Sequence, residues 1–412
     1  MQKAFRDVFS DRMIALTIVV SALGYFVDIF DLLLFSIVRV QSLRDLGVEA
    51  HDLLPVGIRL LNTQMAGLLL GGLVWGVTAD RYGRVSVLFG SITLYSLANI
   101  GNGFVTSVDQ YAVLRFISGL GLAGELGIGV TLASELLPRH IRGLGTTLIA
   151  AFGVLGAAAA TLLSEMTGWR TAYIVGGILG LGLLALRVMV RESDLYKKTA
   201  AKKTPRGTLL TFFRRPELLR RYISVVLVGA PIWATVGIFI TFTPEFAKAF
   251  GMTVLPTAGK AVFYCYLGLA LGDLFSGTLS QYLASRRKSI AVFLCLLIVV
   301  TGLFVTIRAD SLLIYYGLCG LLGVGAGYWA MFVQVGAEQF GTNIRATAAT
   351  SIPNIVRGLT IPMTAGFQAL IPAFGVTASG LVVMTAALVL AFAGLWHIRE
   401  TFHADLDYED TP

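Results

Sequence analysis

The chain has 412 residues, of which 56% are hydrophobic and only 14% are charged. One soluble core cannot bury so much apolar surface. The composition therefore excludes a soluble protein and predicts an all-α protein that resides in a lipid bilayer.

Apolar runs of about 18 to 28 residues recur along the whole chain, and each can cross about 30 Å of hydrocarbon at about 1.5 Å per residue. Twelve membrane-spanning helices are predicted, centred near residues 26, 69, 95, 123, 153, 180, 235, 271, 298, 325, 357 and 386. The spans leave no room for a soluble domain. Residues 1–11 are charged, and the span that follows is too long to be a signal-peptide core, so we expect it to be retained.

Most of the 32 lysines and arginines fall in the tails and in the loops after even-numbered spans. Short loops rich in these residues stay on the cytoplasmic side of a membrane. We therefore predict a cell (inner) membrane protein with both termini in the cytoplasm. The same bias explains the net charge of +8, so no nucleic-acid partner is expected.

The first span carries two carboxylates, Asp28 and Asp31. Residues at positions i and i+3 share a helix face, and two carboxylates so close in a dry cavity disfavour joint ionisation. Ionisable side chains at membrane depth are costly and usually serve function. We therefore predict that Asp28 and Asp31 take part in proton coupling.

A motif of small and charged residues follows the second span: Gly72-x-x-x-Gly76-x-x-x-Asp80-Arg81-x-Gly83-Arg84. Glycines allow two helices to approach closely. The aspartate can face a helix N-terminus, and the arginines can pair with acidic residues at other helix ends, such as Glu135.

The fourth span contains two more ionisable residues. Arg115 is expected at a depth close to that of Asp31, so the two can pair, and Glu125 lies near the middle of the span. We predict that Arg115 and Glu125 belong to the proton-coupling set. Residues 119–124 match a dinucleotide-binding glycine pattern, but they lie in an apolar helix with no preceding strand, where glycines serve close packing.

The two halves of the chain are related. Residues 134–143 align with residues 337–346 at an offset of 203. In this alignment Glu135 matches Glu338, and an Ile-Arg pair ending at Arg142 matches one ending at Arg345. Such symmetry is typical of transporters built from parallel repeats. The only long polar interruption is 191–221, so we predict an N-terminal six-helix bundle (1–190), a cytoplasmic linker (191–221) and a C-terminal six-helix bundle (222–412).

Arg357 lies twelve residues beyond Arg345, about 18 Å into the eleventh span. A cation at that depth needs a partner, which is either Glu125 or another acid across the cavity, or an anionic solute. Further side chains expected to line the cavity and bind the solute are Asn354, Tyr328, Trp329, Gln334 and Trp233. Asp273 is assigned to a decayed second copy of the loop motif, in which Arg286 and Arg287 supply the arginines.

The motif at 72–84 resembles the loop 2–3 signature of the major facilitator superfamily, and the resemblance covers essentially the whole chain. It implies twelve transmembrane helices in two pseudo-symmetric six-helix bundles. It also implies a cytoplasmic gate formed by Gly76, Asp80, Arg81, Gly83, Arg84, Glu135 and Arg142, with Glu338 and Arg345 as its second-half counterparts. Residues 24–32 are similar to helix 1 of the phosphate porters. The arrangement of Asp31 and Arg115 resembles the sugar- and phosphate-porter branches, and the run that ends at Glu125 resembles the metabolite–proton symporters.

The chain has no nucleotide-binding loop and no His-Glu-x-x-His or cysteine-rich metal pattern. We therefore expect no enzyme activity, no cofactor and no metal. The leading hypothesis is a monomeric, proton-coupled carrier that takes up a small, anionic metabolite by alternating access. Proton-coupled efflux of amphipathic compounds and uptake of a neutral sugar are the alternatives.

Overall fold

The computed structural model describes residues 12–82, 84–136, 142–187, 215–307, 311–341 and 344–402. Within these ranges, side chains are described except at 12–17, 77, 79–82, 84–86, 126–136, 142–151, 187 and 346. The described chain is almost entirely helical and contains no strand.

Six long helices form the first half of the molecule. They are α2 (Arg12–Asp45), α3 (Leu53–Tyr82), α4 (Arg84–Asn102), α5 (Val108–Leu136), α6 (Arg142–Thr167) and α7 (Trp169–Arg187). Each contains one of the first six predicted span centres, so these predictions are confirmed.

The second half also has six spans, but three of them are broken. The elements are α10 (Pro216–Ala234), the π-helix η1 (Thr235–Ile240), α11 (Thr243–Ala249), α12 (Ala258–Leu283), α13 (Arg286–Thr306), α14 (Leu312–Ala326), α15 (Trp329–Glu338), α16 (Arg345–Gly358) and α17 (Thr360–His397). The seventh span consists of α10 and η1, and the tenth of α14 and α15. The eleventh runs from α16 into α17, and the chain turns at Gly375 (φ +72°) into the twelfth.

Eight described stretches are long and apolar enough to cross a membrane, and one of them, 347–397, contains the last two predicted spans. The chain is thus an all-α membrane protein with twelve spans. Because α10 begins at Pro216, residues 216–221 of the expected linker are helical, whereas 188–214 lie outside the described residues.

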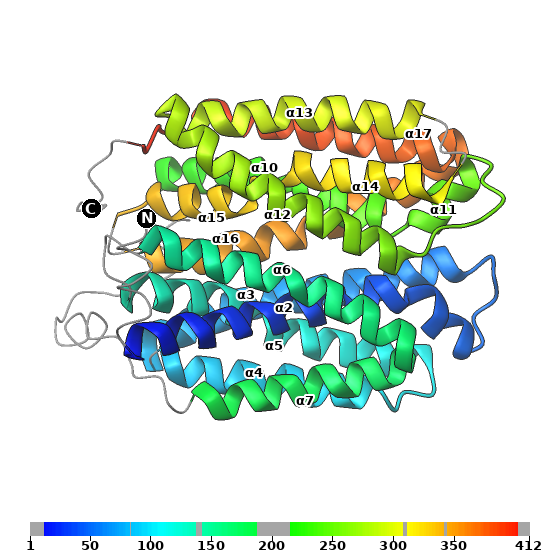
Figure 1. Cartoon of the computed structure of the whole chain (residues 1–412), viewed down its shortest axis with the longest axis horizontal. Helices are drawn as coiled ribbons and strands as arrows, with labels where there is room; N and C mark the ends of the chain where they lie inside the picture. The colour runs from blue at the N-terminus through cyan, green and yellow to red at the C-terminus, as the bar shows by residue number, and fades with distance from the viewer. Residues whose placement is uncertain are drawn as a thin grey trace.

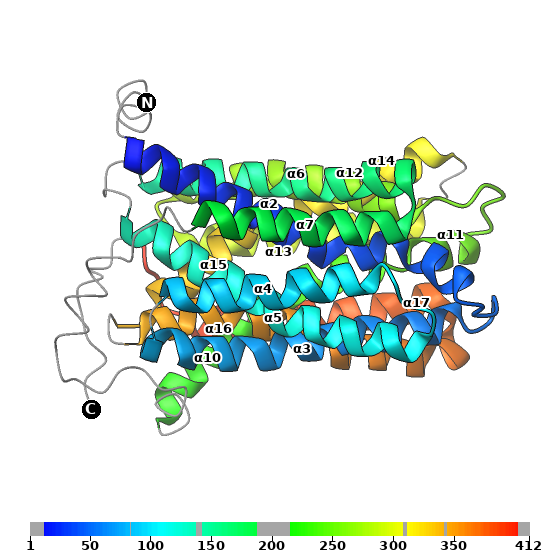
Figure 2. The ribbon, with the colours of Figure 1, turned by 90° about the horizontal axis from the view of Figure 1, so that it is seen from below.

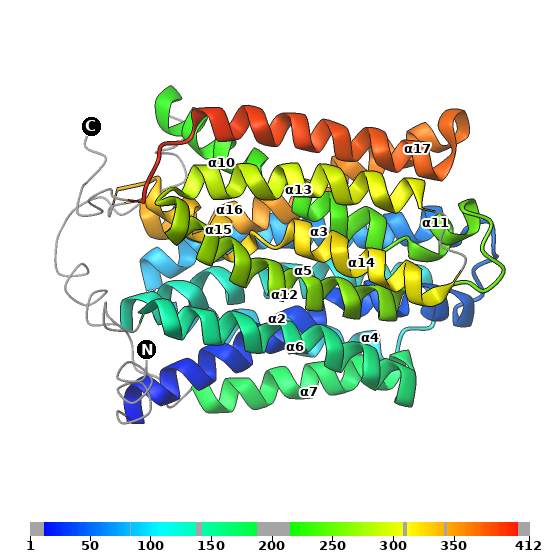
Figure 3. The same ribbon diagram turned by 45° about the horizontal axis from the view of Figure 1, so that its top comes forward.

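The spans run side by side along the longest axis of the molecule, with α2–α7 on one side and α10–α17 on the other (Figure 1). The view from below shows the same alignment of the helices (Figure 2). Between the halves, α12 packs on α6 and α2, and α16 packs on α3 and α5 (Figure 3). The start of α2 and the end of α17 lie at one end, called here the terminal end; α11 lies at the opposite, distal end.

Glycines bring pairs of helices into backbone contact within each half. In the first half, a Cβ at Gly119 of α5 would collide with the carbonyl oxygen of Gln64 in α3. In the second half, a Cβ at Gly323 of α14 would collide with the carbonyl oxygen of Cys265 in α12. Close approach of this kind drives helix association in lipid.

The expected role of Gly72 and Gly76 in helix approach is only half confirmed. Gly72 packs against the side chain of Asn354 in the other half of the molecule. At Gly76, no described residue lies within 4 Å of the position that a Cβ would take, so the described part of the chain shows no close contact there.

The contact between α12 and α14 predicts opposite effects for two glycines of one helix. Replacing Gly323 with Ala should lower the midpoint of thermal unfolding by several degrees, because overpacking a tight contact costs about 1–3 kcal/mol. Replacing Gly317, which has open space around it, should leave the midpoint unchanged or raise it, since Ala favours a helix by about 1 kcal/mol over Gly. Thermal unfolding of the purified protein in detergent measures both, and equal midpoints would contradict the packing argument.

Candidate functional site

The centre of the molecule contains an ion pair that joins the two halves. Arg357 of α16 donates from Nη2 to Oδ2 of Asp28 in α2 at 3.2 Å, and the two side chains are 1% and 0% exposed. Of the partners considered for Arg357, an acid across the interface is present, and that acid is Asp28. Removing one partner from such a buried pair typically costs about 3–5 kcal/mol, because the other charge is left unpaired in a low dielectric.

The ion pair leaves several strong hydrogen-bonding atoms unused. Among the described residues, Nε and Nη1 of Arg357 and Oδ1 of Asp28 have no hydrogen-bond partner although they are buried. Buried polar atoms are normally satisfied, so such exceptions point to a ligand, a water or a proton. Nε and Nη1 of the guanidinium can therefore donate to an acceptor that enters the site.

Two tryptophans flank the guanidinium of Arg357. Its Cζ lies 5.7 Å from the ring centroid of Trp233 and 5.9 Å from that of Trp329, within the range of cation–π attraction. The two rings are 6.4 Å apart and T-shaped. Both residues were predicted to line the cavity, and both adjoin irregular backbone: Trp233 precedes the π-helix η1 by two residues, and Trp329 begins α15.

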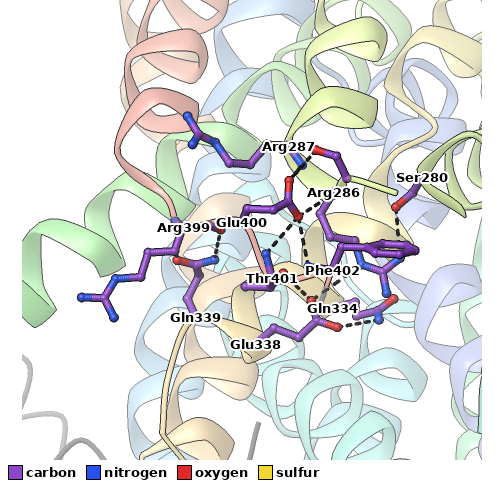
Figure 4. Close-up of polar contacts among 11 residues, drawn as sticks. Ser280, Arg286, Arg287, Gln334, Glu338, Gln339, Arg399, Glu400, Thr401 and Phe402 are labelled. Atoms are coloured by element: carbon purple, nitrogen blue, oxygen red, sulfur yellow. Dashed lines mark hydrogen bonds and ion pairs between the residues drawn. The ribbon is translucent and has the colours of Figure 1, made fainter. Parts of the chain in front are cut away.

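The other predicted solute-binding residues take different positions. Asn354 lies one turn before Arg357 and donates to the carbonyl oxygen of Ala123 in α5 at 3.0 Å, so it bridges the halves. The hydroxyl of Tyr328 donates to the carbonyl oxygen of Val228 in α10 at 2.9 Å. Gln334 donates to Glu338 at 2.7 Å, in the cluster at the end of α15 (Figure 4). Only Asn354 thus shares a helix with the central arginine.

The expected pairing of Asp31 with Arg115 is not made. Arg115 donates to the side-chain oxygen of Gln64 and, at 3.3 Å, to the hydroxyl of Tyr173, and its guanidinium lies over the ring of Phe35. Asp31 is 2% exposed, and neither of its carboxylate oxygens has a hydrogen-bond partner among the described residues. Arg115 thus hydrogen-bonds to neutral partners, and the similar depth of the two residues brings the charges near each other without a direct ion pair.

Glu125, the fourth predicted coupling residue, is buried in α5. Ala123, two residues earlier on the same helix, accepts the hydrogen bond from Asn354. This part of α5 therefore faces α16, the helix that carries Arg357.

At the distal end, a second charged contact crosses between the halves, and no sequence pattern pointed to it. Arg39 of α2 donates from Nη2 to both carboxylate oxygens of Glu245 in α11 at 2.7 Å, and from Nη1 to the carbonyl oxygen of Leu53 at 3.2 Å. The guanidinium is 0% exposed and lies 4.7 Å from the ring centroid of Phe242. Arg39 lies six residues before the end of α2, where a charged residue is easily assigned to the loop that follows.

Most of the predicted gate lies outside the described residues. This holds for Gly83 and for the side chains of Asp80, Arg81, Arg84, Glu135 and Arg142. In the second half, Arg286 Nε lies 3.7 Å from Glu338 Oε2, and Thr401 donates to the same oxygen at 2.6 Å (Figure 4). Arg345 donates to the carbonyl oxygen of Phe340 at 3.0 Å. The second copy of the motif therefore forms an ion pair between Arg286 and Glu338.

Glu400 completes this terminal-end cluster and was not found from the sequence. Its carboxylate accepts hydrogen bonds from the hydroxyl of Ser285 and from the backbone N–H groups of Arg286 and Arg287, at the start of α13. Burial alone would raise the pKa of Glu400, but these hydrogen bonds outweigh it and hold the pKa below its ordinary value.

Comparison with known proteins agrees with this architecture. The model of the Major Facilitator Superfamily matches residues 14–365. The sialic acid transporter NanX of Escherichia coli K12 is 26% identical over 391 residues, which cover 90% of this chain and 91% of that protein. The 4-hydroxybenzoate transporter PcaK of Pseudomonas putida is 31% identical over 239 residues, which cover 53% and 52%. A crystal structure of a D-xylose–proton symporter has a TM-score of 0.69 at 16% identity and covers 94% of this chain and 99% of that one, a likeness of fold.

The central ion pair predicts a non-additive effect of mutation. Arg357→Met should strongly lower the thermal unfolding midpoint because Asp28 is left without a counter-charge. Asp28→Asn should also lower the midpoint, because Arg357 is then left without a counter-charge. The double variant should be more stable than the sum of the two losses allows, since no unpaired charge remains. Thermal unfolding in detergent at neutral pH measures the cycle, and additive losses would show that the two side chains do not depend on each other.

Proposed function

Because the chain belongs to the major facilitator superfamily, it is a multi-pass membrane transporter, and we propose that it takes up a small carboxylate-bearing metabolite together with a proton. The single observation that carries this proposal is the buried guanidinium of Arg357, which is bound to Asp28 through one nitrogen and has no hydrogen-bond partner for Nε and Nη1 among the described residues. We also propose that the terminal end is the cytoplasmic end and that the protein resides in the inner membrane, because the lysine- and arginine-rich segments lie in the tails and the loops after even-numbered spans.

The chemistry of the site favours an anionic solute with a planar part. A guanidinium presents a rigid fork of donors that matches a carboxylate. Trp233 and Trp329 flank that fork with ring surfaces, which suit a flat or aromatic body next to the carboxylate. The names of two relatives support this chemistry, because sialic acid and 4-hydroxybenzoate both carry a carboxylate.

Proton coupling follows from the charge balance of the buried site. In a low dielectric, one guanidinium stabilises one anion well, but a second anion beside it is left uncompensated. A solute carboxylate can therefore displace Asp28 from Arg357 when Asp28 takes up a proton. Proton binding and solute binding then favour each other, and the coupling is reciprocal.

Asp31 offers a second place for the proton. It lies one turn from Asp28 on the same face of α2, and its carboxylate oxygens have no hydrogen-bond partner among the described residues. A proton that leaves Asp28 when the ion pair reforms can reside on Asp31.

Alternating access requires that contacts between the halves break at one end at a time. At the distal end, these contacts include Arg39 with Glu245, Ser36 with Thr241 at 3.0 Å, and Asn62 with Thr364 at 2.7 Å. We propose that they open when the terminal end closes through the motif at 76–84 with Glu135 and Arg142, while Glu338 and Arg345 serve the second half. One chain contains both halves, so the cycle needs no second copy.

A matched set of probes tests the substrate class. We expect 4-hydroxybenzoate, nicotinate or sialic acid to raise the thermal unfolding midpoint of wild type and of Asp28→Asn, and neutral analogues such as nicotinamide or xylose to have no effect. Stabilisation should disappear in Asp28→Asn/Arg357→Met, because that variant has no guanidinium at the site. Arg59→Met is the control, since Arg59 is exposed at the distal end. A neutral sugar that stabilises the protein and still does so without Arg357 would refute the proposal.

Transport by reconstituted protein tests the coupling. With the carboxylate that binds, Asp28→Asn should retain exchange of labelled for unlabelled solute but lose accumulation driven by a proton gradient, because its site can no longer change charge. Asp31→Asn should slow accumulation more than exchange. Asp109→Asn, which alters an exposed ion pair with Arg59, should behave like wild type. Accumulation by Asp28→Asn at the wild-type level would show that the proton binds elsewhere.

A further inference from the structure

The tenth span is broken beside the proposed solute site. Its first part, α14, ends at Ala326, and Gly327 (φ −77°, ψ 51°) and Tyr328 (φ −121°, ψ 19°) leave the helical region before α15 begins at Trp329. The first N–H groups of a helix have no partner within the helix. At α15, the N-cap residue Tyr328 makes no side-chain cap hydrogen bond, so these donors need an acceptor from another element.

Asp273 of α12 supplies that acceptor. Its Oδ1 accepts a hydrogen bond from the backbone N–H of Ala330, the second residue of α15, at 2.9 Å. A carboxylate at a helix N-terminus also interacts favourably with the helix dipole. The sequence assigned Asp273 to the decayed loop motif, and the contact with α15 shows a further role of the residue at the broken span.

Backbone contact between α12 and the break sets this geometry. A Cβ at Gly272 would collide with Cα of Gly327 and with the carbonyl oxygen of Val324, and a Cβ at Gly327 would collide with Cα of Gly272. Asp273 directly follows Gly272, so its carboxylate is held at the start of α15. On the other side of the break, the hydroxyl of Tyr328 donates to Val228 of α10, the helix that carries Trp233.

The residue whose position depends on this cap is Trp329. It is the first residue of α15, it precedes the N–H that Asp273 binds, and its ring lies 5.9 Å from Cζ of Arg357 and 6.4 Å from the ring of Trp233. A change in where α15 begins would rotate Trp329 away from the guanidinium, since successive residues of a helix point about 100° apart.

We propose that Asp273 is a positioning residue for the solute site: by capping α15 across the break, it holds Trp329 over Arg357 and thereby sets the affinity for a planar carboxylate. The effect on affinity rests on the proposed function, whereas the effect on Trp329 does not.

Three variants separate positioning from general stability. Asp273→Ala removes the acceptor, Asp273→Asn keeps an oxygen that can accept from Ala330, and Ser311→Ala removes a different cap in the same span, since Ser311 accepts from the N–H of Ile314 at the start of α14. If Asp273→Ala does not fold, Asp273→Ser replaces it, because its shorter side chain does not reach Ala330 as the carboxylate does.

The first measurement needs no ligand. The protein contains five tryptophans, so fluorine NMR of 5-fluorotryptophan-labelled protein gives one resonance per residue, and Trp329→Phe assigns the one from Trp329. We expect Asp273→Ala to shift and broaden that resonance, and Asp273→Asn and Ser311→Ala to leave it in place. An unchanged Trp329 resonance in Asp273→Ala, or an equal change in Asp273→Asn, overturns the proposed cap.

The second measurement is the affinity for 4-hydroxybenzoate. We expect the Kd to rise about fivefold to tenfold in Asp273→Ala, as for the loss of a helix cap, and to stay within twofold of wild type in Asp273→Asn and Ser311→Ala. A moved Trp329 resonance with an unchanged Kd overturns the link to affinity. If wild type binds no carboxylate but the resonance moves as expected, the proposed function fails while the role of Asp273 in placing Trp329 stands.

Discussion

The buried ion pair between Asp28 and Arg357 constrains both the charge of the central site and the contact between the two halves. It places two full charges in the apolar centre of a membrane protein, where each is tolerable only while the other is present. It also joins the two halves that must move against each other. Any event that neutralises Asp28 or offers Arg357 another anion therefore changes both the charge of the site and the strength of the contact between the halves.

Broken helices supply the surroundings of that pair. Trp233 lies two residues before the π-helix η1, and Trp329 begins α15, so both rings lie next to irregular backbone at membrane depth. Such backbone is tolerated there when other protein groups satisfy its polar atoms. Asp273 does so at the break in the tenth span, where it accepts from the N–H of Ala330, and the hydroxyl of Tyr328 ties the same break to the carbonyl oxygen of Val228 in α10. The close glycine contacts of α12 with α14 bring these groups near enough to bond.

The two ends of the molecule are held by different kinds of contact. At the distal end, Arg39 and Glu245 link the first half to the second, so this contact opposes their separation. At the terminal end, the described contacts of Arg286, Glu338 and Glu400 lie within the second half. They hold α12, α13, α15 and the segment after α17 together as one unit. A carrier that opens by moving one half against the other needs contacts between the halves and contacts within each half. When each half moves as a rigid unit, a change in the central ion pair also changes the contacts at the ends.

The twelve spans, the relation between the halves and the short set of intramembrane charges could all be predicted from the sequence. Apolar length, residue spacing and the rarity of buried charge are properties of the chain itself. Which of these charges meet depends on the packing of the helices against one another. Asp31 and Arg115 were expected at a similar depth, yet Arg115 binds Gln64 and Tyr173. Arg357, from the other half, pairs with Asp28. Depth follows from a rise of about 1.5 Å per residue, whereas partnership depends on which helix faces which, and packing across the interface sets that. The partners of Arg39 and Asp273 were not predicted for the same reason: they lie on other helices, so no local pattern marks them.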